Sequence, residues 1–316
     1  MGRLERFLFF QESDRWISIL RLGLALQLIG FDVALRRDWT YLLSVGNRGL
    51  ISRDLMEAAL NAQSSFIPRL GWLTEIGQKL GVPESTALWV VWGCLFMAAL
   101  LLLLGLFSRA AAVSAWLIHL CVVKSVGYLS YGVDNFTTIG LFYLMIVPPP
   151  DRLSLDFMMR GRSGKTELIS FFRRVLQIHV CFIYFFGGLA KLAGIGWWNG
   201  TNLWRALTVP PFHFVDPNLV LHYKAFLPAA GLVICLLEFG YPFFIWSRVT
   251  RTYWLIFVCV MHLTIALTMG MFLFAFIMIV LNLAAFMPMP RSVVRLFSHE
   301  VLASESEAAT EMPDAP

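Results

Sequence analysis

Charged residues are scarce in this sequence. Only 14% of its 316 residues are Asp, Glu, Lys or Arg, whereas a soluble domain has about 25%. Apolar residues make up 58%, against about 45–50% in a soluble domain. These values exclude an ordinary soluble domain and indicate an integral membrane protein. The net charge of +5 is spread over predicted loops, so it reports membrane topology and indicates no nucleic-acid partner.

Paired cysteines and the common catalytic motifs are also absent. The five cysteines lie in apolar runs, their number is odd, and none forms a C-x-x-C pair. This pattern predicts neither a disulfide framework nor a thiolate metal site, and buried thiols pack as small apolar side chains. The sequence has no H-E-x-x-H motif, no Walker loop and no G-x-G-x-x-G motif at the start of a helix. We therefore predict no metal site.

Long apolar runs dominate what is present. About 20 mostly apolar residues suffice to cross the hydrocarbon core as a helix. The sequence predicts an all-α integral membrane protein, a bundle of about eight transmembrane helices with interfacial segments at 36–81 and 194–224. The expected spans are 16–35, 86–107, 110–127, 136–148, 175–192, 226–246, 253–271 and 272–287. The last two are separated so weakly that one long bent element is an alternative.

The chain divides into one membrane domain and a tail. We predict a transmembrane domain over 1–290 and a cytoplasmic, largely disordered tail over 291–316, which is acidic and rich in Ala and Ser. With the N-terminus inside, the inside segments hold more Lys and Arg than the outside segments, so both termini are expected in the cytoplasm. The expected location is a multi-pass position in a cell membrane, surrounded by lipids.

Charges at membrane depth usually face the interior of a bundle and mark candidate functional positions. Arg21 and Asp32 share one face of the first predicted span, but a rise of about 16 Å separates them. We expect each to meet a partner on another helix, and a catalytic role is the alternative. Glu238 lies inside the sixth predicted span, where a carboxylate without a partner would tend to take up a proton.

A polar cluster separates the third and fourth predicted spans. Tyr128, Tyr131, Asp134 and Asn135 follow or overlap the motif GYLSYG. An ordinary exposed turn explains these residue types. The flanking aromatic residues and the short fourth span favour a partly buried turn instead.

The fifth predicted span carries the strongest candidate site. Gln177, Tyr184 and Lys191 recur every seven residues, which places them on one stripe that drifts about 20° per heptad. Gly187 and Gly188 would let another helix approach closely. From the residues alone, Lys191 is typical of a lysine that snorkels to the interface, and a catalytic role is the alternative.

Three other side chains need an interpretation. His262 lies on an apolar helix, where a lone histidine is typical of a structural residue and a binding role is the alternative. His179 lies about 120° from Lys191 around the helix and is expected to serve a different contact. Trp198 belongs to a tryptophan-rich segment that is expected at the membrane–water interface.

Four blocks of sequence, taken in order, carry a family resemblance. They are LRLGLALQLIGFD, GYLSYGVDNFTTIGLFYLMIVPP, LQIHVCFIYFFGGLAKLAGIGWWNGTNLW and HLTIALTMGMFLF, and they extend from about residue 16 to residue 288. The chain resembles the horizontally transferred transmembrane domain family, whose best-known members are the vitamin K-dependent gamma-carboxylases. The third block is the most specific, because it combines Y-F-x-x-G-L-x-K-L with W-x-x-G-T.

The resemblance implies a chemistry and a cofactor. In the carboxylases, a lysine in the matching segment is the base that deprotonates vitamin K hydroquinone; oxygen then yields a strong base that removes a glutamate γ-proton before carbon dioxide adds. The matching residue is Lys191, and a dry environment favours the neutral amine that a base must be. The implied cofactor is reduced vitamin K or menaquinone, in an apolar cavity with Tyr184 and Lys191 at its wall. We predict that Asp134, Asn135 and His262 position the substrate and that Gln177, Tyr131, Tyr184 and Trp198 contact the cofactor.

Two functions follow as alternatives. The first is a compact bacterial membrane enzyme that acts on a reduced quinone or another lipophilic substrate. The second is a membrane factor that matures or exports a peptide without redox chemistry. Eukaryotic carboxylases carry a large region outside the membrane, and this chain continues only a short way past its last predicted span, so carboxylation of protein glutamates is not expected.

Overall fold

The computed structural model describes residues 2–9, 14–45, 52–147, 151–160, 166–210 and 214–288. These residues form helices, and no strand occurs among them, which confirms the predicted all-α class. The helices belong to one compact unit, Met1–Phe286. The predicted tail, 291–316, lies outside the described residues.

Five helices are long and apolar enough to cross a membrane. They are α2 (Arg15–Leu35), α6 (Glu84–Leu104), α10 (Thr166–Ala193), α14 (Leu227–Phe244) and α15 (Arg251–Met269). The other three predicted spans coincide with the shorter or less apolar helices α7 (Ser108–Ser125), α8 (Gly132–Ile146) and α16 (Phe272–Phe286). A helix therefore lies at each predicted span, while the number that crosses the membrane stays a prediction.

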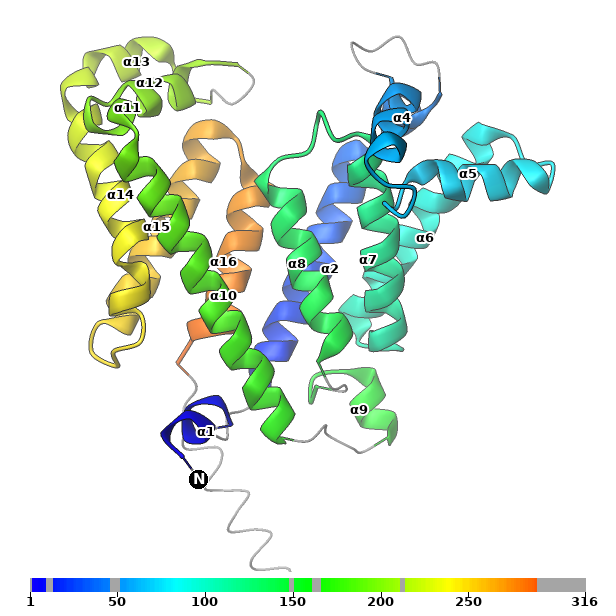
Figure 1. Ribbon diagram of the computed structural model, residues 1–316, viewed down its shortest axis with the longest axis horizontal. Helices are drawn as coiled ribbons and strands as arrows, with labels where there is room; N and C mark the ends of the chain where they lie inside the picture. The colour runs from blue at the N-terminus through cyan, green and yellow to red at the C-terminus, as the bar shows by residue number, and fades with distance from the viewer. Residues whose placement is uncertain are drawn as a thin grey trace, which may run out of the picture. The chain divides into compact units, whose positions relative to one another are not determined.

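The remaining helices are short. They are α1 (Arg3–Leu8), α3 (Trp39–Leu43), α4 (Arg53–Gln63), α5 (Leu70–Lys79), α9 (Leu155–Arg160), α11 (Ile195–Trp198), α12 (Thr201–Thr208) and α13 (Pro217–His222), with a 3₁₀ turn at Lys224–Phe226. The predicted interfacial segments thus contain α3–α5 and α11–α13. These short helices lie around the ends of the long ones (Figure 1).

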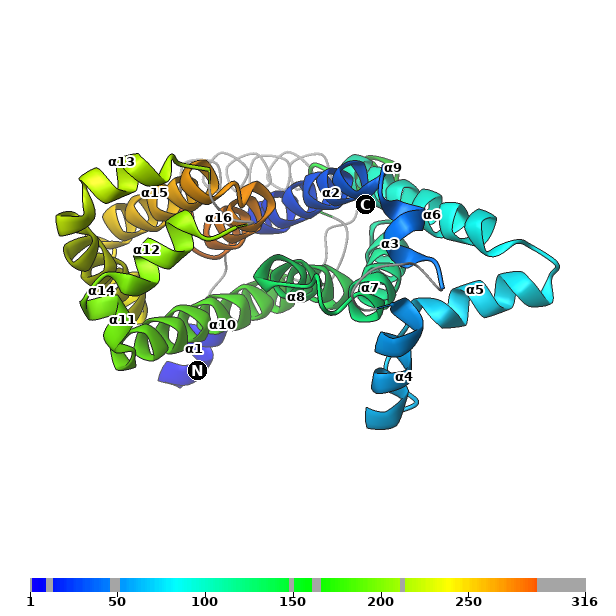
Figure 2. The same ribbon diagram turned by 90° about the horizontal axis from the view of Figure 1, so that it is seen from above.

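The long helices pack in a continuous series. Helix α10 packs against α14 and α16, α15 packs against α16 and α14, and α16 also packs against α2 and α8. On the other side of α2 follow α6 and α7, and α7 packs against α8. Viewed from above, α10, α14, α15 and α16 surround one end of the unit (Figure 2). The polar stripe predicted on α10 therefore has three neighbouring helices to face.

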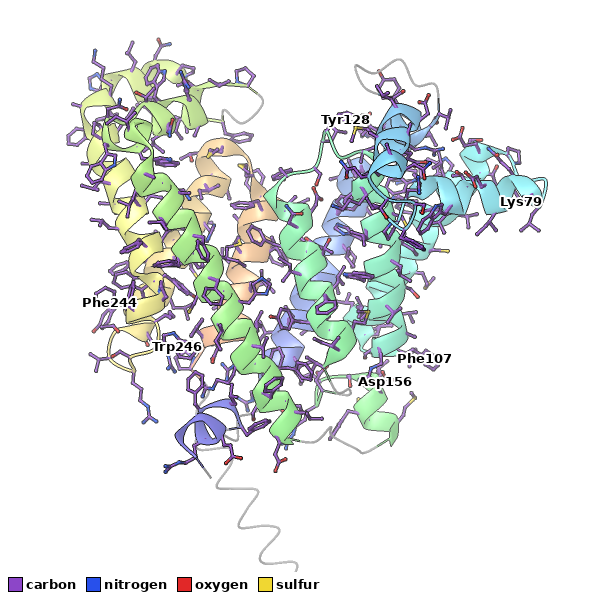
Figure 3. The ribbon with its side chains drawn as sticks, in the orientation of Figure 1. Lys79, Phe107, Tyr128, Asp156, Phe244 and Trp246 are labelled. Carbon is purple, nitrogen blue, oxygen red and sulfur yellow. The ribbon has the colours of Figure 1, made fainter. Side chains whose placement is uncertain are left out.

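The connections between the helices alternate between two sides. Figure 3 places Tyr128 and Lys79 on one side, and Phe107, Asp156 and Trp246 on the opposite side. Tyr128 lies between α7 and α8, and Phe107 lies between α6 and α7, so consecutive connections lie on opposite sides. This alternation is what antiparallel neighbours joined by short connections require.

The outward faces of these helices are apolar. Large side chains are more than 45% exposed along them, including Leu26, Val90, Phe182, Val233 and Leu267. Soluble monomers rarely expose so much contiguous apolar surface. Together with the five candidate spans, this surface identifies a multi-pass membrane protein.

The charge of Arg21 is fully satisfied inside the bundle. Its side chain is 1% exposed, and its Nε atom lies 2.7 Å from Oδ2 of Asp151. Its Nη1 atom also donates to the carbonyl oxygen of Leu102 at 2.6 Å. The expected partner thus exists, but it lies in the segment after α8 and not on a helix. For Asp32, neither carboxylate oxygen has a partner among the described residues.

A second buried arginine holds the interfacial helices onto the bundle. Arg53, on α4, lies 2.9 Å from Oε1 of Glu84 at the start of α6, and its Nη1 atom donates to the carbonyl oxygen of Leu43 at 2.7 Å. Glu57, also on α4, accepts from Oγ of Ser125 on α7 at 2.6 Å. The region 36–81 is therefore anchored through α4 to both α6 and α7.

The boundary between α15 and α16 is sharper than the sequence indicated. Gly270 adopts φ +71°, in the left-handed region that favours glycine. Its N–H donates to the carbonyl oxygen of Ala266 at 2.9 Å, which ends α15. The two elements are separate helices, and the alternative of one long bent element is wrong.

Candidate functional site

The predicted stripe on α10 faces the bundle. Gln177 and Tyr184 are buried, and Lys191 is partly buried. Nε2 of Gln177 donates to the carbonyl oxygen of Ala285 on α16 at 2.6 Å. Phe182 and the opposite face of the same helix are exposed. The seven-residue spacing therefore predicted the orientation of this helix correctly.

Two glycines bring α14 against this stripe. A Cβ atom on Gly188 would lie 2.4 Å from the backbone nitrogen of Phe239, so no larger residue fits without separating the helices. A Cβ atom on Gly187 would lie 3.3 Å from Oε2 of Glu238 and 3.8 Å from Nζ of Lys191. The missing side chains of Gly187 and Gly188 therefore create the space in which Glu238 reaches the lysine.

Lys191 and Glu238 form an ion pair at this crossing. The Nζ atom lies 2.5 Å from Oε2, and the two side chains are 25% and 11% exposed. The Nζ atom also lies 5.5 Å from the ring centroid of Trp197, which is a cation–π distance. Lys191 is thus held by two partners within the protein, whereas a snorkelling lysine would extend its amine into the water layer.

A hydrogen-bonded network lies further along the same stripe. The hydroxyl of Tyr184 lies 2.7 Å from Nε2 of His262 on α15 and accepts from Nδ2 of Asn282 on α16 at 2.7 Å. The hydroxyl of Tyr241, on α14, donates to Oδ1 of Asn282 at 2.7 Å. The rings of Tyr184 and Tyr241 stack with centroids 4.2 Å apart. One network therefore joins all four helices around the candidate site.

The Asp134 cluster forms a separate group. Asp134 lies in the first turn of α8 and accepts from the backbone N–H of Tyr131 at 3.1 Å. Its Oδ1 atom lies 3.9 Å from Nε2 of His119 on α7, and Thr138 connects to the same histidine at 3.3 Å. Asn135 is exposed. The partly buried turn expected here is the start of a helix, and its polar groups face α7.

Burial also affects the phenol of Tyr131, which precedes α8. Desolvation raises the pKa of Tyr131, and the negative charge of the nearby Asp134 carboxylate raises it further. The phenol therefore stays neutral and keeps its proton at any physiological pH. It is able to donate a hydrogen bond but not to act as a base there.

A cavity of about 170 Å³ lies beside this second cluster. Apolar side chains of α2, α3 and α7 line it, together with Leu273, Tyr131 and Asp134. For comparison, a dry cavity of about 150 Å³ in another protein binds benzene. Neither Tyr184 nor Lys191 is among its lining residues. This cavity is therefore not the apolar cavity that was expected beside Tyr184 and Lys191. The contact of these two residues with a cofactor stays a prediction.

Trp198 lies on α11, directly after α10. It is 49% exposed on α11, and its Nε1 atom donates to the carbonyl oxygen of Leu192 at 2.7 Å. His179, expected to serve a different contact from Lys191, has its Nδ1 atom 3.1 Å from the hydroxyl of Tyr143. Among the described residues, no group of His, Cys, Asp and Glu side chains could hold a metal ion.

Three residues of the site are missing from the set predicted from the sequence. The sequence shows Glu238 as a carboxylate at membrane depth, but it does not show that Glu238 is the partner of Lys191. Asn282 and Tyr241 are not in the set, although an amide in the otherwise apolar run of α16 is itself a signal. Their role becomes visible only when the four helices are placed together.

Comparison with known proteins identifies one related family. A model of the HTTM domain matches residues 75–289. The match covers more than half of the chain and includes the Lys191–Glu238 pair, His262 and Asn282. No curated protein and no solved structure matches the chain.

Proposed function

Because the chain belongs to the HTTM domain family, the domain of vitamin K-dependent gamma-carboxylase-like proteins, we propose that it is a membrane-embedded enzyme acting on a reduced quinone. Lys191 is the base, and the quinone binds among α10, α14, α15 and α16. The observation that carries the proposal is the Lys191–Glu238 pair, 2.5 Å apart, beside a buried polar network. A lysine that served only as an anchor would need no carboxylate on a neighbouring span.

The pair explains how a lysine could act as a base here. In a medium of low dielectric constant, separated charges are costly, and a bonded ammonium and carboxylate lower that cost by sharing the proton as a neutral pair. Glu238 then holds the proton, and the neutral Nζ amine can donate one of its N–H groups to the carboxyl while its lone pair faces the bound molecule. The amine takes a hydroxyl proton from the bound molecule, and Glu238 remains as the hydrogen-bond partner of the ammonium.

The residues present fit a reduced quinone. When bound, that molecule supplies an ionisable ring hydroxyl and the electrons that oxygen accepts. Nδ1 of His262 is buried and has no hydrogen-bond partner among the described residues, so it is available to bond a polar atom of a ligand. Tyr184 and Asn282 hold that histidine in place.

Enrichment of quinone tests the proposal even though the substrate is unidentified. The protein is purified in mild detergent, its lipids are extracted, and the ratio of quinone to phospholipid is measured by mass spectrometry. We expect a higher ratio than in the membrane from which the protein was purified, and oxygen-dependent turnover of added reduced menaquinone-4. A ratio equal to that of the membrane, with no turnover, would contradict the proposal and favour the peptide-handling alternative.

We further propose that all eight helices cross a bacterial cytoplasmic membrane, with the connection between α14 and α15 inside the cell. The alternation of the connections (Figure 3) supports this arrangement. In intact cells, a membrane-impermeant maleimide is expected to label Asn218→Cys, in α13, and to label Ser247→Cys, after α14, only once the membrane is opened. Labelling of Ser247→Cys in intact cells would rule out this topology.

A further inference from the structure

We infer that the Nδ1–H group of His262 donates a hydrogen bond to a ring oxygen of the bound quinone. The inference rests on the proposed function and assigns one atom of the protein to one atom of the ligand. It follows from the position of each hydrogen in the buried network around Tyr184.

The amide orientation of Asn282 is determined by its neighbours. Nδ2 donates to the carbonyl oxygen of Met278 at 2.8 Å, and a backbone carbonyl can only accept. The second hydrogen of Nδ2 points to the hydroxyl oxygen of Tyr184 at 2.7 Å. Oδ1 accepts from the hydroxyl of Tyr241 at 2.7 Å. All the polar atoms of this amide are therefore used. In the reversed orientation, the amide oxygen would face the carbonyl oxygen of Met278, and two acceptors would meet.

The hydrogen of Tyr184 follows from this arrangement. Its hydroxyl oxygen already receives a hydrogen from Asn282, and the other partner at hydrogen-bond distance is Nε2 of His262, 2.7 Å away. The phenol has one hydrogen to donate, so it donates to Nε2. Nε2 of His262 is thus an acceptor, and the hydrogen of the neutral imidazole is on Nδ1.

The other tautomer is less favourable. If Nε2 carried the hydrogen, it would donate to Tyr184, whose own hydroxyl hydrogen would then lack an acceptor among the described residues. The lone pair on Nδ1 would also lack a donor. Two buried polar groups would be unsatisfied, whereas the assigned tautomer leaves one. Each such group is costly to bury.

Within this network, and among the described residues, the unsatisfied group is the Nδ1–H donor. His262 is 3% exposed, and Nδ1 has no partner among the described residues. The ring meets Phe274 edge-on with centroids 5.7 Å apart, so its surroundings are buried and partly aromatic. A ligand that fits such surroundings presents an apolar ring and one oxygen acceptor, as a quinone does.

Two substitutions separate the two nitrogens of the imidazole. In His262→Gln, the longer side chain can reach the position of Nε2 and keep the bond to Tyr184, but it places nothing at Nδ1. In His262→Asn, the shorter amide lies near the position of Nδ1 and can still donate to a ligand, but it does not reach Tyr184. The first variant removes the inferred contact, and the second keeps it.

The probe is menaquinone-4 labelled with ¹³C at its ring carbonyls, and the measurements are its infrared carbonyl frequency and its dissociation constant. With the native protein, we expect one carbonyl band below its frequency in detergent alone. His262→Gln should lose this shift and bind about tenfold more weakly, as expected for one hydrogen bond in a dry site. His262→Asn should retain the shift.

Each other outcome is decisive. Unchanged frequency and affinity in a folded His262→Gln variant would overturn the inference and leave the proposed function intact. Equal loss of the shift in both variants would show that His262 acts only through Tyr184, and it would overturn the inference as well. A native protein that binds neither menaquinone-4 nor its reduced form would overturn the proposed function together with the inference.

Discussion

Lys191→Arg is expected to lower turnover of reduced menaquinone by about 10²–10⁴-fold, the usual contribution of a general base, without unfolding the protein. Arginine is always positively charged, so it can pair with an ionised Glu238 and lie over Trp197. It cannot release its proton under ordinary conditions. The substitution therefore preserves every contact that an anchoring lysine makes and removes only the ability to act as a base.

The matched control for this substitution is Lys124→Arg. Lys124 lies in the last turn of α7 and is exposed, so the same chemical change there should leave turnover unchanged. Both variants are compared with the native protein by thermal unfolding in detergent and by complementation of a deletion strain. Full complementation by Lys191→Arg would show that Lys191 is an anchor, and the function would then revert to peptide maturation or export.

The second large effect is expected on stability. Arg21→Leu should lower the free energy of unfolding by about 3–5 kcal/mol, the usual cost of leaving one partner of a buried ion pair alone. Asp151 would then be buried without its guanidinium. The carbonyl oxygens of Leu102 and Leu153 would also lose the hydrogen bonds that the guanidinium donates to them. Denaturant unfolding in mild detergent, followed by tryptophan fluorescence, measures the change.

Arg152→Leu provides the control. The Arg152 side chain is 58% exposed and lies 3.6 Å from Asp14, whose side chain is 9% exposed, so this pair with one solvated partner is expected to contribute less than the fully buried Arg21–Asp151 pair. The double variant Arg21→Leu, Asp151→Leu should recover part of the stability, because no unpaired charge then remains inside. Equal effects of Arg21→Leu and Arg152→Leu would contradict the central role of the Arg21–Asp151 pair.

Much of the fold could be predicted from the sequence, because burial in lipid requires long apolar runs and self-contained backbone hydrogen bonding. The main errors are at the ends. The sequence predicted a span from residue 175, but α10 begins at Thr166. Its first turns contain Glu167, Arg173 and Arg174, and a polar stretch of helix gives no hydropathy signal. The same reason accounts for α4 and α5, whose region was predicted only as an interfacial segment.

The orientation of α10 was predictable and its partners were not. A seven-residue spacing depends only on helix geometry, so it placed Gln177, Tyr184 and Lys191 on one face. The contact between Lys191 and Glu238 depends on how α14 is rotated and how deep it lies, which the local sequence does not determine. The two glycines on α10 indicated a close approach without indicating which helix approaches.

The grouping of the site residues shows the same limit. From the sequence, Asp134 and His262 were predicted to share one site with Lys191. In the structure, His262 shares a network with Tyr184, while Asp134 lies beside His119 and a different cavity. Residues on α8 and α15 are far apart in the chain. Patterns in a single sequence do not show how far apart such residues lie in the folded protein.

The length of α10 links this chemistry to the lipid around it. Its 28 residues extend about 42 Å, compared with a hydrocarbon core of about 30 Å. In Figure 1 this helix runs obliquely past α8. One end is held at Arg173, whose Nε atom donates to the carbonyl oxygen of Ala285 at 3.2 Å, and Lys191 lies near the other end. A thinner bilayer favours greater tilt of such a helix, so the acyl-chain length of the host's lipids would help determine how far Lys191 lies from the water.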